Sequence, residues 1–260
     1  MSMPILNNAK IVLHDLKKSY KKNYKLFISM ISTFMLVFLI RSVLALLDSI
    51  FAIDEYPLQR ILFMVSSTCL ILGLEIGFTK IIFTGLDKGK IIITDIFNYF
   101  HLLVKYIYGL FIFYGILLLI IIPAFVFLHF QFNGEFLSIV YNSLDDPYYQ
   151  ELIYSYLDLK ILFVLALILI IPTTYISIRL LFWSYFVIDK EMGGYEAIKN
   201  SFIISKHKTH EIIFYLFLIL LFNLIGLLSI IGICFTIPLT YIFLCKYYRL
   251  ILHKTKLDVQ

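Results

Sequence analysis

Four polar side chains lie inside long apolar stretches of the sequence, where ionisable groups are costly and mark candidate functional sites. They are Arg41, Glu75, Arg179 and Asn223. Glu75 and Arg179 fall at matching depths, so we predict that they form an ion pair, whereas Asn223 can hydrogen-bond across helices. Such groups would suit a transporter or a lipid-handling site. The alternative for all four is that they hold helices together or extend to the membrane surface.

Patterns for catalysis and metal binding are sparse in this chain. His207 and Glu211, four residues apart beside His210, come closest to metal-ligand spacing, but their lysine-rich surroundings favour a solvated surface. The motifs of zinc proteases, serine hydrolases and phosphate-binding loops do not occur in the sequence. We therefore expect no catalytic residue, no metal and no cofactor, and we expect that the protein is not an enzyme.

The elements that position these side chains are apolar runs long enough to cross a membrane. Of the 260 residues, 61% are hydrophobic and only 15% are charged, whereas about 25% is usual in a soluble protein. About 20 apolar residues span the hydrocarbon core as a helix. We predict an all-α, polytopic transmembrane helix bundle with about six spans, at 27–47, 61–79, 103–128, 160–178, 212–229 and 231–246. A tight turn near Gly226 to Gly232 would join the last two, with a single bent helix or a re-entrant hairpin as the alternatives.

The distribution of basic residues orients these spans. Nineteen Lys and Arg residues fall in the N-terminal segment, in or just after the loop 80–102, in the loop 179–211, and in the C-terminal segment. Only Arg60 and Lys160 lie at the opposite edges. The outer segments there, which are the stretch between the first two spans and the loop 129–159, carry acidic residues instead. This positive-inside pattern predicts a multi-pass protein of the cytoplasmic (inner) membrane with both termini in the cytoplasm. The net charge of +5 then requires no nucleic acid partner.

Two cytoplasmic segments have the pattern of amphipathic interfacial helices. In the first, Ile96, Phe97, Phe100 and Leu103 share one side of a helix. In the second, which Gly193 and Gly194 precede, the shared face carries Tyr195, Ile198 and Phe202. We expect both helices to lie in the headgroup zone with their apolar side toward the membrane. The residues expected to form a cytoplasmic interface are Asp189, Gly194, Glu196, Lys199 and Ser201.

Three prolines fall inside predicted spans and are candidate helix kinks, because proline removes a backbone donor. They are Pro123, Pro172 and Pro238. The last two belong to a repeated sequence, IPTTYI from Ile171 and IPLTYI from Ile237, in spans that would run in the same direction. Packing of kinked helices in a bundle is one interpretation. The other is a transporter built from repeats, with a site between broken helices.

Three sequence features are found together between about residues 60 and 250. They are the glycine-bearing inner loop IGFTKIIFTGLDKGKIIITDIF, the segment VIDKEMGGYEAIKNS after the fourth span, and a proline before the closing YYR. This combination resembles a family of six-span bacterial integral membrane proteins of unknown function, related to the membrane domain of some glycerophosphoryl diester phosphodiesterases. The resemblance implies the six-span architecture and implies no reaction. The residues that match its pattern are Asp189, Gly194, Glu196, Ala197 and Ser201.

Taken together, the sequence favours a non-enzymatic integral membrane protein that acts as an accessory or scaffold subunit of a membrane complex. The partners expected are membrane lipids and either another membrane protein or further copies of the chain. The alternative is a transporter or lipid-handling protein with a site between proline-kinked spans.

Overall fold

The computed structural model describes residues 14, 24–51, 57–143, 146–156, 158–206 and 208–254, and all regular structure within these ranges is helical. Five helical segments are long and apolar enough to cross a membrane: Tyr24–Ser49, Leu58–Lys88, Ile93–Gln131, Leu159–Lys190 and Thr209–Leu227. The predicted all-α fold of a multi-pass membrane protein is therefore confirmed. The sixth expected span lies in a 25-residue helix that is not among these five and that carries Lys246, Arg249 and Lys254 in its second half.

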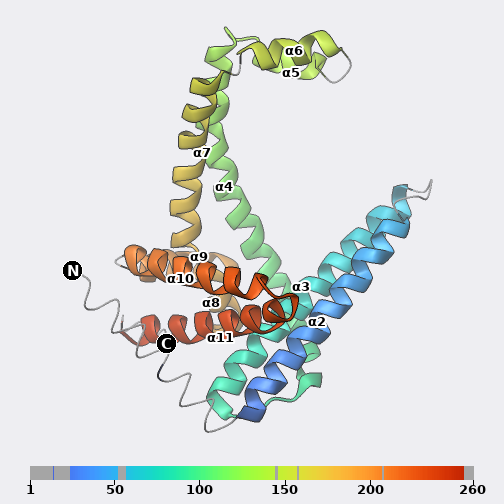
Figure 1. Cartoon of the computed structure of the whole chain (residues 1–260), viewed down its shortest axis with the longest axis vertical. Coiled ribbons are helices and arrows are strands. Elements are labelled where there is room, and N and C mark those ends of the chain that lie inside the picture. The colour runs from blue at the N-terminus through green and yellow to red at the C-terminus, as the bar shows by residue number, and fades with distance from the viewer. Residues whose placement is uncertain are drawn as a thin grey trace. The chain divides into compact units, whose positions relative to one another are not determined.

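Figure 1 labels the helices in chain order. Their bounds are α2 Tyr24–Phe51, α3 Pro57–Lys88, the 3₁₀ helix η1 Ile93–Leu102, α4 Leu103–Gln131, α5 Phe136–Asn142, α6 Pro147–Tyr156, α7 Leu159–Arg179, α8 Trp183–Lys190, α9 Gly194–Ser205, α10 Thr209–Leu227 and α11 Ile230–Lys254. The chain divides into two compact units. Unit 1 comprises residues 1–109 and 182–260, and unit 2 comprises residues 110–181.

Within unit 1, α2 and α3 pack side by side in opposite directions (Figure 1). Phe34 of α2 contacts Phe78 of α3, with ring centroids 5.8 Å apart. The same phenylalanine of α3 contacts Tyr241 of α11 at 5.7 Å, and five residues further on Phe83 contacts Tyr248 at 5.8 Å. The contacts of α3 and α11 therefore follow in the same chain order, as expected for two helices that run in the same direction.

The segment predicted as an inner loop, 80–102, is mostly helical and folds back on α3. Helix α3 continues to Lys88 and ends at Gly89, whose φ of 69° is the left-handed conformation that glycine adopts readily. The chain then reverses, and η1 packs along α3 so closely that a Cβ at Gly77 would lie 2.1 Å from the carbonyl oxygen of Ile96. The expectation of a helix with its whole apolar side toward lipid is thus corrected, because Ile96 is buried against α3 while Phe97 is exposed.

Helices α10 and α11 form an antiparallel hairpin. Tyr215 contacts Tyr247 with ring centroids 4.3 Å apart, and the Asn223 amide donates to Thr240 Oγ1 at 3.2 Å. The chain turns between Leu227 and Ile230, where the sequence predicted a tight turn. The alternative of a single bent helix is therefore wrong. The choice between two full crossings and a re-entrant hairpin stays open.

Unit 2 contains most of α4, all of α5, α6 and α7, and little buried surface. Phe132, which is 2% exposed, packs against Phe136 at 5.3 Å and Tyr156 at 4.7 Å between ring centroids. Helix α6 begins at Pro147, and Asp158 caps α7 by accepting a hydrogen bond from the Ile161 amide at 2.8 Å. In α4 and α7, by contrast, only 6% of the most apolar 18-residue window is buried.

The three predicted kink positions all lie inside helices. Pro123 is in α4, Pro172 in α7 and Pro238 in α11, and each helix continues on both sides of its proline. The two copies of the repeated sequence fall in different units, one in α7 and one in α11.

Candidate functional site

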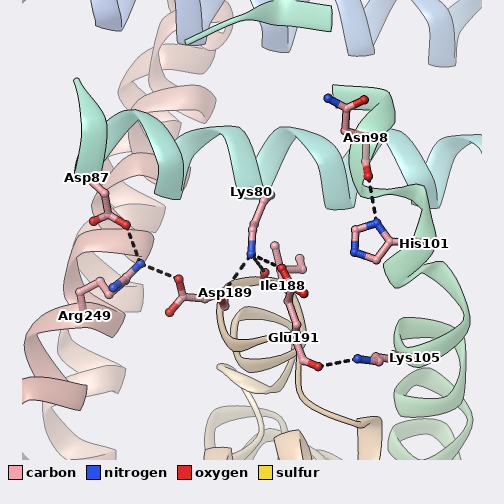
Figure 2. Close-up of polar contacts among 9 residues, drawn as sticks. All are labelled: Lys80, Asp87, Asn98, His101, Lys105, Ile188, Asp189, Glu191 and Arg249. Atoms are coloured by element: carbon pink, nitrogen blue, oxygen red, sulfur yellow. Dashed lines mark hydrogen bonds and ion pairs between the residues drawn. The ribbon is translucent and has the colours of Figure 1, made fainter. Parts of the chain in front are cut away.

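A group of ion pairs surrounds the carboxyl end of α8 in unit 1, and it is the densest cluster of charge in the described part of the chain (Figure 2). Helix α8 ends because Glu191 adopts φ 56°, a left-handed conformation that is uncommon for a residue with a side chain. The last carbonyl groups of a helix lack partners within it and carry partial negative charge, so a cation is favoured there.

Lys80 of α3 supplies that cation. Its ammonium donates to the carbonyl oxygens of Ile188 at 2.9 Å and Asp189 at 3.3 Å. It also donates to Glu191 Oε1 at 2.9 Å. One lysine therefore caps α8 and holds the side chain of the residue that ends it, and Figure 2 shows Lys80 pointing from α3 into this end of α8.

A second lysine holds the backbone of the same turn. Lys105, in the first turn of α4, donates to the carbonyl oxygen of Glu191 at 2.7 Å. The hydrogen bond from Lys80, and to a lesser extent the charges of Lys80, His101 and Lys105, lower the pKa of the Glu191 carboxyl below its usual value. Glu191 is thus fixed from α3 and from α4, which accounts for its persistence in an unfavourable backbone conformation.

Arg249 of α11 completes the cluster by bridging two carboxylates. Its Nη2 lies 3.0 Å from Asp87 Oδ2 and also donates to Asp189 Oδ1. The Asp189 side chain is 5% exposed, whereas that of Asp87 is 58% exposed. The guanidinium also lies 5.2 Å from the centroid of the Phe83 ring. These contacts tie α3, α8 and α11 together.

Buried aromatic rings surround the cluster. Tyr248 contacts Tyr185, Phe182 and Phe186, with ring centroids 5.6, 5.9 and 5.2 Å apart. All four rings are buried. Because these rings exclude water, the charges of Asp189 and Arg249 interact more strongly than they would on an open surface.

Glu75 has a partner that the sequence did not predict. Its Oε1 lies 3.0 Å from Arg41 Nη1, an ion pair between α3 and α2 within unit 1. Arg179 ends α7 in unit 2, where it is 2% exposed and its guanidinium lies 5.8 Å from the Tyr175 ring centroid. The antiparallel packing of α2 on α3 places Arg41 opposite Glu75. The pairing of Glu75 with Arg179, which lies in the other unit, stays a prediction.

The predicted cytoplasmic interface is also corrected. Asp189 is held by Arg249, and Ser201 is buried with its hydroxyl accepting a hydrogen bond from the Phe182 amide at 3.1 Å. Gly194 is buried too, because a Cβ there would lie 2.4 Å from the Gly109 backbone nitrogen. These three residues therefore pack unit 1.

Only the other two predicted interface residues, Glu196 and Lys199, are exposed on α9. The helix itself begins at Gly194, one residue before the segment that the sequence predicted to be helical. Its expected apolar face is split, since Ile198 is buried while Tyr195 and Phe202 are 62% and 40% exposed.

Of the carboxylates in the cluster, the sequence analysis singled out only Asp189, as an interface residue and not as a member of an ion pair. Asp87, Asp189 and Glu191 are three of the six acidic residues in the segments 80–102 and 179–211, which together carry eight Lys and Arg residues. An acid retained among lysines on the positively charged side is a candidate for a specific ion pair. Lys80, Lys105 and Arg249 were counted for orientation, and the structure gives them these carboxylates and the α8 carbonyls as partners.

The cluster has the chemistry of a structural network. Its ammonium and guanidinium groups point at carboxylates and carbonyls of the same chain. Among the described residues, no group of three or more His, Cys, Asp and Glu side chains is placed to hold a metal ion. His207, which with Glu211 came closest to metal-ligand spacing in the sequence, lies outside the described residues.

The resemblance to six-span bacterial membrane proteins stays a prediction. Comparison of the chain with protein-family models, curated proteins and solved structures finds no match.

Proposed function

We propose that this chain is a non-enzymatic accessory or scaffold subunit of a complex in the cytoplasmic membrane, and that it binds its partner through the apolar helices of unit 2. The observation that carries the proposal is the contrast in burial between the units. In unit 1 the charged side chains of the α8 cluster pair with one another and hold helices together. In the spans that contain α4 and α7, only 6% of the most apolar 18-residue window is buried, against 17–28% in the three spans of unit 1.

The exposed surface of α4 has the form of a helix-packing face. Phe111, Gly115, Leu118 and Ile122 recur at i, i+4, i+7 and i+11, and all four are exposed. No atom lies within 4 Å of the position that a Cβ on Gly115 would take. A small residue at the centre of an apolar stripe allows a second helix to approach closely, which is how helices commonly associate in membranes. Lipid alone would place no such demand on residue size.

The test is native mass spectrometry of the tagged protein extracted from its own membrane in a mild, lipid-preserving detergent. We expect a stoichiometric second membrane protein or a homo-oligomer. In the Gly115→Leu variant we expect that assembly to be lost without a change in melting temperature, because the added side chain meets nothing within this chain. Val43→Leu, at a 54% exposed position on α2, is the matched control and should keep the assembly. Assembly that survives Gly115→Leu would contradict the proposed face.

A second candidate, a transporter or lipid-handling protein, is favoured by one observation. The side chains of Arg41 and Glu75 are 62% and 40% exposed, although the helices that carry them are apolar. A charge pair that faces the surroundings of α2 and α3 could contact a polar ligand. A lone protein that retains a defined lipid or small molecule in the same experiment would favour this second function over the first.

A further inference from the structure

A pocket of about 150 Å³ lies in unit 1 where α3 ends and η1 begins. One wall comes from the last turns of α3, one from the turn that follows, and one from η1. The residues that bear on its chemistry are Ile81, Thr84, Lys88, Lys90, Ile91 and Tyr99. The pocket is distinct from the α8 cluster, because it does not include Asp87, Asp189, Glu191 or Arg249.

The reversal of the chain after α3 creates this space. Toward the middle of α3, η1 sits directly on the helix at Gly77 and Ile96. At the turn, the Ile91 side chain packs against Gly85, where a Cβ would lie 2.9 Å from Ile91 Cδ1. The segments on each side of the pocket are therefore held by close contacts, so the pocket is part of the fold.

Two lysines at the pocket differ from the other cations near this end of the molecule. Lys80, Lys105 and Arg249 are all engaged by carboxylates or carbonyls. Lys88 and Lys90 are exposed and, within the described part of the chain, form neither an ion pair nor a side-chain hydrogen bond. They bring two positive charges to the pocket.

The remaining lining indicates what kind of anion would bind. Most of the wall is apolar, with Ile81 and Ile91 beside the lysines and Thr84. Asp95 is the acidic group in the lining, and its Oδ1 accepts a hydrogen bond from the Asn98 amide at 3.1 Å. A ligand that satisfies both parts of the pocket carries negative charge at one end and apolar groups next to it. The volume suits a phosphate and its adjoining glycerol carbons rather than a whole lipid, since pockets for drug-sized ligands measure about 300 Å³ or more.

We propose that this pocket binds the headgroup of an anionic glycerophospholipid, with its phosphate against Lys88 and Lys90 and its glycerol region against Ile81 and Ile91. Basic pockets at the cytoplasmic ends of membrane helices bind anionic headgroups in this way. The end of α3 lies at that depth in the orientation that the basic residues predict. The inference does not depend on whether the chain has a protein partner.

The test is to titrate the purified full-length protein in detergent with phosphatidylglycerol or with phosphatidylcholine, and to count bound lipids by native mass spectrometry. We expect tighter binding of phosphatidylglycerol. The double variant Lys88→Ala/Lys90→Ala should lower its affinity by about 10- to 30-fold, because each lysine near an anionic lipid contributes about fivefold or somewhat less. The control Lys199→Ala/Lys206→Ala removes the same charge from exposed positions on and just after α9 and should change the affinity by less than about twofold.

Two further measurements separate the alternatives. Thr84→Leu adds bulk inside the pocket without changing charge, and it should weaken phosphatidylglycerol binding while leaving the lipid-free melting temperature unchanged. Water-soluble glycerol 3-phosphate should compete poorly, because it lacks the apolar part. Equal losses in the two lysine double variants, unchanged binding in Thr84→Leu, or full competition by glycerol 3-phosphate would each overturn the proposal.

Discussion

The guanidinium of Arg249 donates a hydrogen bond to the carboxylate of Asp189, a residue 60 positions away in the sequence and on another helix. The Asp189 side chain is 5% exposed, and burying a carboxylate is costly unless a cation compensates it. This pair is therefore the contact in the α8 cluster whose loss should matter most.

Removing the cation should destabilise the fold strongly. We expect Arg249→Gln to reduce the free energy of unfolding by about 3 kcal/mol, because it leaves Asp189 buried without its partner. The measurement is denaturant-induced unfolding in mixed micelles. Asp87→Asn is the matched control, because Asp87 pairs with the same arginine but has a 58% exposed side chain. It should cost about 1 kcal/mol or less. Equal effects of the two variants would mean that burial does not set the strength of these pairs.

The two adjacent glycines at the start of α9 provide a matched pair for testing close packing. At Gly194 a Cβ would lie 2.4 Å from the Gly109 nitrogen and 3.0 Å from the Lys105 carbonyl oxygen, so backbone would have to move. We expect Gly194→Ala to cost about 1–3 kcal/mol. Gly193 has φ −64° and open space around its Cβ position, so Gly193→Ala should stay within about 1 kcal/mol of the wild type. Melting temperatures of the two variants, measured side by side, check the difference.

The sequence predicted the features of the fold that depend on local pattern. Apolar runs gave the helical membrane class, and the glycines near 226–232 predicted the turn between α10 and α11. It failed where two distant segments decide the outcome. Ile96 has the spacing of an interfacial residue, but Gly77 on α3 admits η1 and buries it.

The sequence likewise did not predict which charged residues pair with each other. Glu75 and Arg179 matched in expected depth, but depth along a helix does not specify which neighbour a side chain faces. The Arg41–Glu75 contact requires the packing register of α2 against α3, which the nearly continuous apolar surface of both helices does not encode.

The Arg41–Glu75 pair can be tested by reversing both charges. Each single change, Arg41→Glu or Glu75→Arg, places two like charges together between apolar helices and should lower the melting temperature clearly. The double variant Arg41→Glu/Glu75→Arg restores opposite charges and should recover most of that loss. Arg60→Glu, at an exposed position near the start of α3, is the control and should have little effect. If the decrease in melting temperature of the double variant equals the sum of the decreases of the two single variants, the two side chains do not interact.

The Lys80–Glu191 contact should make stability depend on pH in the acid range. The pKa of Glu191 is lowered from its ordinary value of 4.5, chiefly by the hydrogen bond from Lys80, so the folded protein binds this proton less readily than the unfolded chain. The contact therefore stabilises the fold fully above pH 4.5, and this contribution is lost as pH falls through the lowered pKa. Wild type should melt above Glu191→Gln at neutral pH, and the difference should shrink below pH 4.5. In a Lys80→Met background the same substitution should give a smaller and less pH-dependent difference, because the largest cause of the shift is gone. A difference between wild type and Glu191→Gln that stays constant down to strongly acid pH would contradict the assignment of Lys80 as the group that holds Glu191 ionised.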